Sequence, residues 1–91
     1  MNTIELEPHL QKQVDFGSSG LDIIHGHLKV LMLVAERELE EAQRIEEEND
    51  YSDAMESMER KYWEGYTDAL GALYGLTYAL SFAIEERENR D

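Results

Sequence analysis

Apolar residues recur at steps of three and four along two long segments, residues 21–45 and 55–83, and neither segment contains a proline. Such steps place apolar side chains along one face of an α-helix, whereas a half-buried β-strand needs a step of two. One turn-forming run, residues 49–52, separates the two segments. The pattern predicts an all-α fold, an antiparallel hairpin of two long helices at about residues 20–48 and 52–88.

Capping residues support these helix ends. Ser19 places a hydroxyl at the N-cap of the first long helix, and Asp22 follows three residues later, which makes a capping box. Ser52 or Asp53 can cap the second long helix. Each long helix therefore has a start that the residues themselves define.

Residues 1–19 form a lead-in segment without the long period. Pro8 suits the first turn of a helix and Gly17 suits its end, so we predict a short helix over about residues 8–16. The alternative is a pair of short strands that meet across residues 8–12. That alternative rests on apolar residues next to acids on either side, namely Ile4, Leu6, Val14 and Phe16.

A single hairpin cannot cover all the apolar surface of these helices. The length of 91 residues fits one domain, residues 1–91, with the hairpin over residues 20–91. A hairpin has one contact layer and no enclosed core. The first long helix is apolar around nearly its whole circumference at residues 28–35, and the second carries one long apolar stripe (Met58, Tyr62, Tyr66, Ala69, Leu73, Leu76, Leu80 and Ala83) and a second one (Trp63, Leu70, Tyr74 and Tyr78).

Association is the simplest physical remedy. Two hairpins related by a twofold axis would form a four-helix bundle, so we predict a homodimer. The residues we assign to the core or dimer seam are Leu28, Leu31, Tyr66, Ala69, Leu73, Leu76 and Leu80. The alternatives are a lead-in segment folded over a monomeric hairpin and a different partner chain.

Three glycines interrupt the second long helix, Gly65, Gly71 and Gly75. Each costs a helix about 1 kcal/mol relative to alanine, so we expect a neighbouring helix or the chain's own aromatic rings to fill the space above them. Residues 69–84 carry no charge, but a run of this length is too short to cross a bilayer. We therefore expect no membrane partner.

Acidic residues concentrate where the hairpin turns. Residues 36–60 hold eleven acids against three arginines, a net charge of −8. Glu36 and Glu40, four residues apart, have Cβ atoms about 5–6 Å apart, which is comparable to the spacing of successive phosphates in a nucleic-acid strand. We predict that these acids form an acidic tip, which binds a basic surface of a partner protein. The residues that we assign to the acidic tip are Glu36, Glu40, Glu41, Glu47, Glu48, Asp50, Asp53 and Glu56.

Helix electrostatics bear on this acidic tip in two ways. Glu46, Glu47 and Glu48 oppose the negative pole of the first long helix and should cost stability, which favours a functional reason for them. The alternative is a merely solvated face, in which Glu40 pairs with Arg44 and Glu56 pairs with Arg60 four residues later.

Other chemistry has little support in the residues. The chain has no cysteine, no Ser-His-Asp arrangement, no glycine-rich phosphate loop and no basic–aromatic patch, and its net charge of −13 disfavours nucleic acid and anionic membranes. We expect no catalytic residue, no metal ligand and no cofactor. Two minor alternatives are a magnesium site of the nucleotide pyrophosphatase type, from Glu38 and Glu41 facing Asp53 and Glu56, and a metal site at Asp22, His25 and His27. His25 and His27 lie on different faces of a helix, and only Asp22 and His25 share one.

The segments Tyr62 to Leu70 and Leu76 to Ile84 resemble small helical proteins encoded by phages of actinobacteria. The resemblance covers about the last third of the chain. It implies a role in host takeover or in countering host defence, and it brings no catalytic or binding residue with it.

These observations favour a small non-enzymatic binding protein in the host-cell cytoplasm. Its acidic tip would occupy a basic surface, as an inhibitor or nucleic-acid mimic acting on a host nucleic-acid-binding or defence protein. The cytoplasmic assignment rests on the absence of cysteine and of a signal-peptide pattern. The alternative is a structural or assembly module that dimerises through its aromatic, Gly/Ala-rich second helix.

Overall fold

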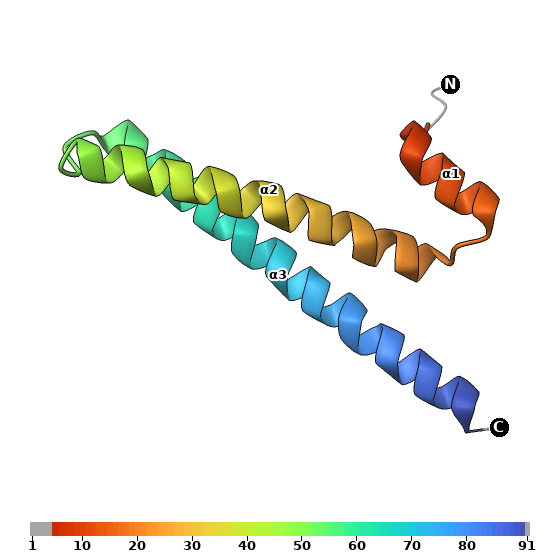
Figure 1. The fold of residues 1–91 in the computed structure, drawn as a ribbon. Coiled ribbons are helices and arrows are strands. Elements are labelled where there is room, and N and C mark those ends of the chain that lie inside the picture. The colour runs from red at the N-terminus through yellow and green to blue at the C-terminus, as the bar shows by residue number, and fades with distance from the viewer. Residues whose placement is uncertain (1–4, 91) are drawn as a thin grey trace.

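The computed structural model describes residues 5–90, which contain three helices and no strand (Figure 1). They are α1 (Pro8–Phe16), α2 (Gly20–Glu48) and α3 (Ala54–Asn89). The all-α fold class is confirmed, and the bounds of the two long helices lie within two residues of those expected.

Local chemistry explains where each helix begins. Pro8 occupies the first turn of α1, where a missing N–H costs nothing. The Ser19 hydroxyl accepts from the Asp22 backbone N–H at 3.1 Å and so caps α2. Of the two candidate caps for α3, Asp53 serves, because its carboxylate accepts from the Met55 N–H at 2.9 Å.

The short lead-in helix is confirmed over residues 8–16, and the alternative pair of strands is wrong for the described part of that segment. Gly17 ends α1 in the left-handed region with φ of 98°, and the next residue's N–H reaches back to the Gln13 carbonyl. No residue of α1 is buried, and Phe16 is 89% exposed. Ile4, part of the strand alternative, lies outside the described residues.

Helices α2 and α3 run back along each other after a five-residue loop and separate toward the end away from that loop (Figure 1). Small side chains allow the close approach, since Ala35 is fully buried and Ala42 is nearly so. The core is thin. Its buried apolar residues are Leu28, Ala35, Ala42 and Leu70, with Leu31, Met32, Trp63 and Tyr74 packed partly buried around Leu28, Ala35 and Leu70.

The side of α3 that meets α2 carries three residues of the shorter apolar stripe (Trp63, Leu70 and Tyr74) together with Thr67 and Thr77. The fourth residue of that stripe, Tyr78, is 50% exposed. The longer apolar stripe of α3 faces solvent. Because the two long helices pack only on each other, the molecule is extended, and its radius of gyration is 18.1 Å, against about 12 Å for a compact chain of this length. The accessible surface is 7301 Å², against about 5,500 Å² for a compact protein of this mass.

Candidate functional site

Four carboxylates of the predicted acidic tip are exposed and make no side-chain hydrogen bond or ion pair within residues 5–90. We call this set the acidic strip; its members are Glu36, Glu40, Glu47 and Asp50. Steps of four and seven place the three glutamates on one face of α2, and Asp50 follows in the loop just beyond the helix. Their charge is open to a partner.

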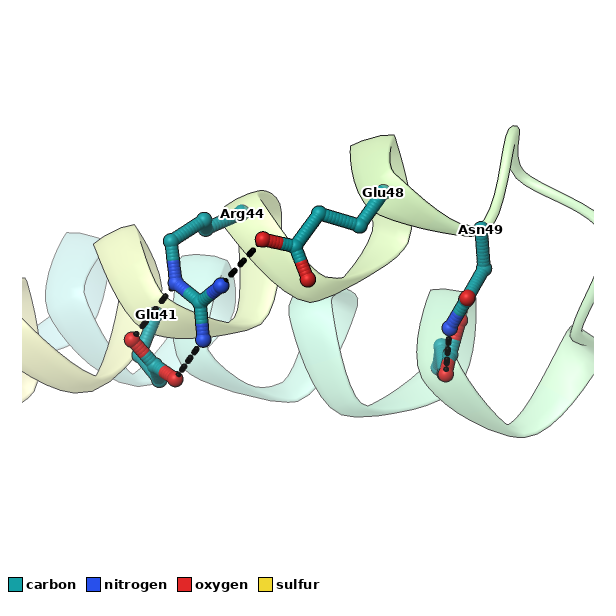
Figure 2. Close-up of polar contacts among 5 residues, drawn as sticks. Glu41, Arg44, Glu48 and Asn49 are labelled. Carbon is teal, nitrogen blue, oxygen red and sulfur yellow. Dashed lines mark hydrogen bonds and ion pairs between the residues drawn. The ribbon is translucent and has the colours of Figure 1, made fainter.

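Two other carboxylates of the predicted tip are held by Arg44 (Figure 2). The guanidinium donates from Nε to Glu41 at 3.1 Å, from Nη2 to the other oxygen of Glu41, and from Nη1 to Glu48. The hydrogen bond from Arg44 lowers the pKa of Glu41 below its ordinary value. The predicted pair of Glu40 with Arg44 is therefore wrong, because the three-residue step to Glu41 allows a two-bond contact.

The last two residues of the predicted tip serve the loop. Asp53 caps α3, and Glu56 accepts from the Asn49 amide at 2.6 Å, which links the end of α2 to the start of α3. Glu41, Glu48, Asp53 and Glu56 thus have structural partners within the chain. The structure separates the predicted tip into these four residues and the acidic strip.

One acid that the sequence predicts only as an unfavourable charge at the end of the first long helix is a buried carboxylate on another face of α2 from the acidic strip. Glu46 is 1% exposed and faces α3, where the Ser57 hydroxyl donates to one carboxylate oxygen and Arg60 Nε donates to the other. Arg60 Nη1 also donates to Glu64 at 2.9 Å. We call Glu46, Ser57, Arg60 and Glu64 the buried polar network.

The buried polar network changes two expectations. The predicted pair of Glu56 with Arg60 is wrong, because Arg60 lies on the side of α3 that faces α2. The hydrogen bond from Ser57, followed by the one from Arg60, lowers the pKa of Glu46, so this acid is stabilised as a carboxylate despite its place near the negative pole of α2. The helix-dipole argument for a functional reason applies only to Glu47, since Glu48 is held by Arg44.

A signal for this network existed in the sequence. Glu46 follows Ala35 and Ala42 on the same helical face, at steps of seven and four, and Ser57, Arg60 and Glu64 repeat at steps of three and four on α3. Reading polar residues with the same periodicity as apolar ones would have found it.

The histidines connect helices. The His25 ring accepts or donates at Nδ1 to the Thr77 hydroxyl at 2.7 Å and stacks on Tyr74 with ring centroids 4.4 Å apart. The same hydroxyl lies 3.0 Å from the Tyr74 carbonyl oxygen, so when it donates there it accepts from His25 Nδ1. The His27 ring instead lies 6.0 Å from that of His9 in α1, so the two histidines do occupy different faces of α2.

The structure does not bring together the side chains of the predicted alternative metal sites within residues 5–90. Glu41, Asp53 and Glu56 hold the partners described above, and Glu38 is exposed. Within residues 5–90, no three His, Asp or Glu side chains gather closely enough to hold an ion. None of the described helices combines the length and apolar character needed to span a membrane.

The predicted core or dimer seam divides between two surfaces. Leu28 is buried and Leu31 half-buried between α2 and α3, whereas Tyr66, Leu73, Leu76 and Leu80 are between 37% and 55% exposed and Ala69 is exposed as well. These five residues of α3, which we call the α3 outer face, contact no other element strongly enough to be buried. An added Cβ at Gly65, Gly71 or Gly75 would meet nothing within 4 Å, so no helix or ring among residues 5–90 fills that space.

A shallow hollow near the loop between α2 and α3 is lined by both apolar and acidic side chains. Its lining is apolar at Ala42, Ile45 and Met55 and acidic at Glu56 and Glu59. Such a lining suits the aliphatic stem and cationic head of a lysine or arginine side chain.

Comparison of this chain with protein-family models, with curated proteins and with solved structures gives no match.

Proposed function

We propose that this chain is a small non-enzymatic binding protein whose acidic strip contacts a basic surface of a partner protein. The observation that supports the proposal is the set of four exposed carboxylates that no cation neutralises within the described residues. Arg44 and Arg60 form ion pairs with other acids of the same region, Glu41 and Glu46. Its remaining negative charge therefore attracts an external cation, with fast and salt-sensitive association.

The chemistry of the acidic strip favours a nucleic-acid-binding partner. Glu36 and Glu40 are separated by one helical turn, about 5–6 Å between Cβ atoms, so they can occupy places that successive phosphates take in a basic groove. The resemblance of the segments Tyr62 to Leu70 and Leu76 to Ile84 to phage-encoded helical proteins makes a host defence protein the natural example. In this role the chain is an inhibitor that competes with nucleic acid.

Charge substitution with a matched control tests the proposal. One variant carries Glu36→Gln, Glu40→Gln, Glu47→Gln and Asp50→Asn. The control removes the same four charges from exposed positions of α3, Asp68→Asn, Glu85→Gln, Glu86→Gln and Glu88→Gln. We expect the first variant to capture less than a tenth as much basic protein from host lysate at low salt as the natural chain does. Its helicity, measured by circular dichroism, should be unchanged. Equal capture by both variants contradicts the proposal, and so does capture that high salt leaves intact.

A second candidate function is assembly, in which two copies form a four-helix homodimer through α3. The exposed α3 outer face favours it, as does the accessible surface, which exceeds that of a compact protein by about 1,800 Å² per chain. A standard protein–protein interface removes about 800 Å² from each partner. Sedimentation equilibrium should give twice the chain mass of 10.6 kDa at micromolar concentration. A measured mass equal to that of one chain at every concentration argues against assembly.

A further inference from the structure

Charge is distributed unevenly along the α2–α3 pair. Residues 20–35 of α2 carry one acid and one lysine, and residues 69–84 of α3 carry no charged residue, whereas residues 36–60 carry a net charge of −8. The first two ranges lie together away from the loop, as the contact of His25 with Thr77 shows. We call them the neutral half and residues 36–60 the acidic half.

The neutral half leaves its apolar residues uncovered. Ile24 on α2 is 55% exposed although it continues the seam that buries Leu28, because α2 and α3 separate at this end (Figure 1). Leu76 is 55% exposed and Leu80 42%. A groove between the start of α2 and the end of α3 lies at the edge of this open surface, and its lining is apolar at Leu21 and Ile84, hydroxylic at Ser19 and Ser81, and acidic at Asp22, Glu85 and Glu88.

We infer that a second copy of this chain covers this surface, with the two neutral halves joined, the two α3 helices antiparallel and the acidic halves pointing in opposite directions. The inference rests on the assembly function proposed above and specifies its geometry. The surplus surface of about 1,800 Å² per chain is more than twice what a standard interface takes from each partner. A second copy carries an identical uncharged segment at residues 69–84 of α3, so the centre of the contact contains no unpaired charge.

Electrostatics determine the direction of the second copy. In a parallel dimer, the acidic halves would lie one interhelical distance apart, about 8–10 Å, which is close to one Debye length at physiological salt. Their like charges would then repel. In an antiparallel dimer centred near Leu76, residue 58 of each copy lies about 18 residues from the centre, or roughly 50 Å from its counterpart at 1.5 Å per residue. The charges are then screened from each other.

Spin labels can measure this geometry because the chain contains no cysteine. Met58→Cys and Leu76→Cys each introduce one label on an exposed position of α3, and Ala72→Cys serves if the label at residue 76 weakens association. Pulsed electron paramagnetic resonance should give about 50 Å between labels at residue 58 and less than about 20 Å at residue 76 or 72. Dimer formation of each labelled variant is checked by sedimentation.

The outcomes separate this inference from the assembly proposal. Short distances at both residue 58 and residue 76 overturn the antiparallel geometry but leave assembly standing. Long distances at both residues in a dimer overturn the assigned surface. If the unlabelled chain and the labelled variants are all monomeric, both the assembly proposal and the antiparallel geometry are overturned. None of these results affects the test of the acidic strip.

Discussion

At the residue scale, the loop between α2 and α3 contains two successive residues in the left-handed region, Asp50 with φ of 53° and Tyr51 with φ of 59°. Aspartate tolerates this region, whereas for an aromatic residue it costs on the order of 1 kcal/mol. The Tyr51 side chain is 62% exposed, so little packing compensates the cost. The strain is therefore open to relief by glycine.

We predict that Tyr51→Gly is more stable than Tyr51→Ala by about 1 kcal/mol, because both changes remove the ring and only glycine adopts this φ freely. Chemical denaturation followed by circular dichroism measures the difference. Ser52, whose φ is not positive, provides the control, since Ser52→Gly should gain nothing over Ser52→Ala. Equal stability of the two Tyr51 variants would show that the left-handed geometry is not maintained in solution.

A second residue-scale prediction concerns Glu46, whose pKa is lowered chiefly by the hydrogen bond from Ser57. A lowered pKa in the folded chain means that the stabilisation is complete above the ordinary glutamate value and is lost as pH falls through the lowered value. At pH 7, Glu46→Gln should melt roughly 5 °C below the natural chain. The gap should narrow as the pH falls below about 4, the ordinary range for glutamate.

Comparing the two proteins at each pH isolates Glu46 from the other acids, which titrate in both. Glu47→Gln is the matched control, because Glu47 is exposed and has no partner within the described residues. Its melting temperature should equal or exceed that of the natural chain at pH 7, since one repulsive charge near the negative pole of α2 is removed. A gap for Glu46→Gln that stays constant with pH would contradict the lowered pKa.

At the element scale, two glycines have opposite roles that follow from their backbone. Gly26 lies inside α2 with open space where a Cβ would go, so Gly26→Ala should stabilise the chain by about 1 kcal/mol. Gly17 ends α1 at φ of 98°, so Gly17→Ala should shorten or fray α1. Denaturation measures the first effect, and hydrogen exchange of α1 amides measures the second. A destabilising Gly26→Ala would indicate a close neighbour over that position.

Helix ends were predictable from sequence because they depend on local chemistry. Pro8, Gly17, Ser19 and Asp53 act within a few residues of themselves, and the structure uses each as expected. The choice of contact face on α3 was not predictable in this way. Two stripes compete for α2, and the less apolar one packs there, carrying the threonines and Arg60 that meet His25 and Glu46.

The position of the acidic tip was predictable from the sequence, whereas the partners of its acids were not. Its position near the loop follows from the hairpin pattern, but the pairing of each acid depends on side-chain reach across helices. Arg44 could be placed near several acids by spacing, and only the structure shows that it holds Glu41 and Glu48. Counting charge along the sequence therefore overstated the free carboxylates by a factor of two.

At the scale of the whole molecule, stability should depend on protein concentration. One chain buries few apolar residues, so association across the α3 outer face would supply much of the missing burial. For a dimer that dissociates on unfolding, a tenfold rise in concentration adds about 1.4 kcal/mol per dimer to the apparent stability, which raises the melting temperature by a few degrees. The natural chain should show this shift between about 2 and 200 μM.

Leu73→Glu should abolish this rise of the melting temperature with concentration, because it places a charge on the α3 outer face. Leu73 is 48% exposed and does not belong to the hydrophobic core between α2 and α3. The matched control is Phe16→Glu, which puts the same charge on α1 at a position that is 89% exposed. The control should keep the concentration dependence, since α1 buries nothing. A Leu73→Glu chain that melts at the same temperature as the natural chain at every concentration would mean that the apolar stripe is not an interface, and that one chain is held together by α2 and α3 alone.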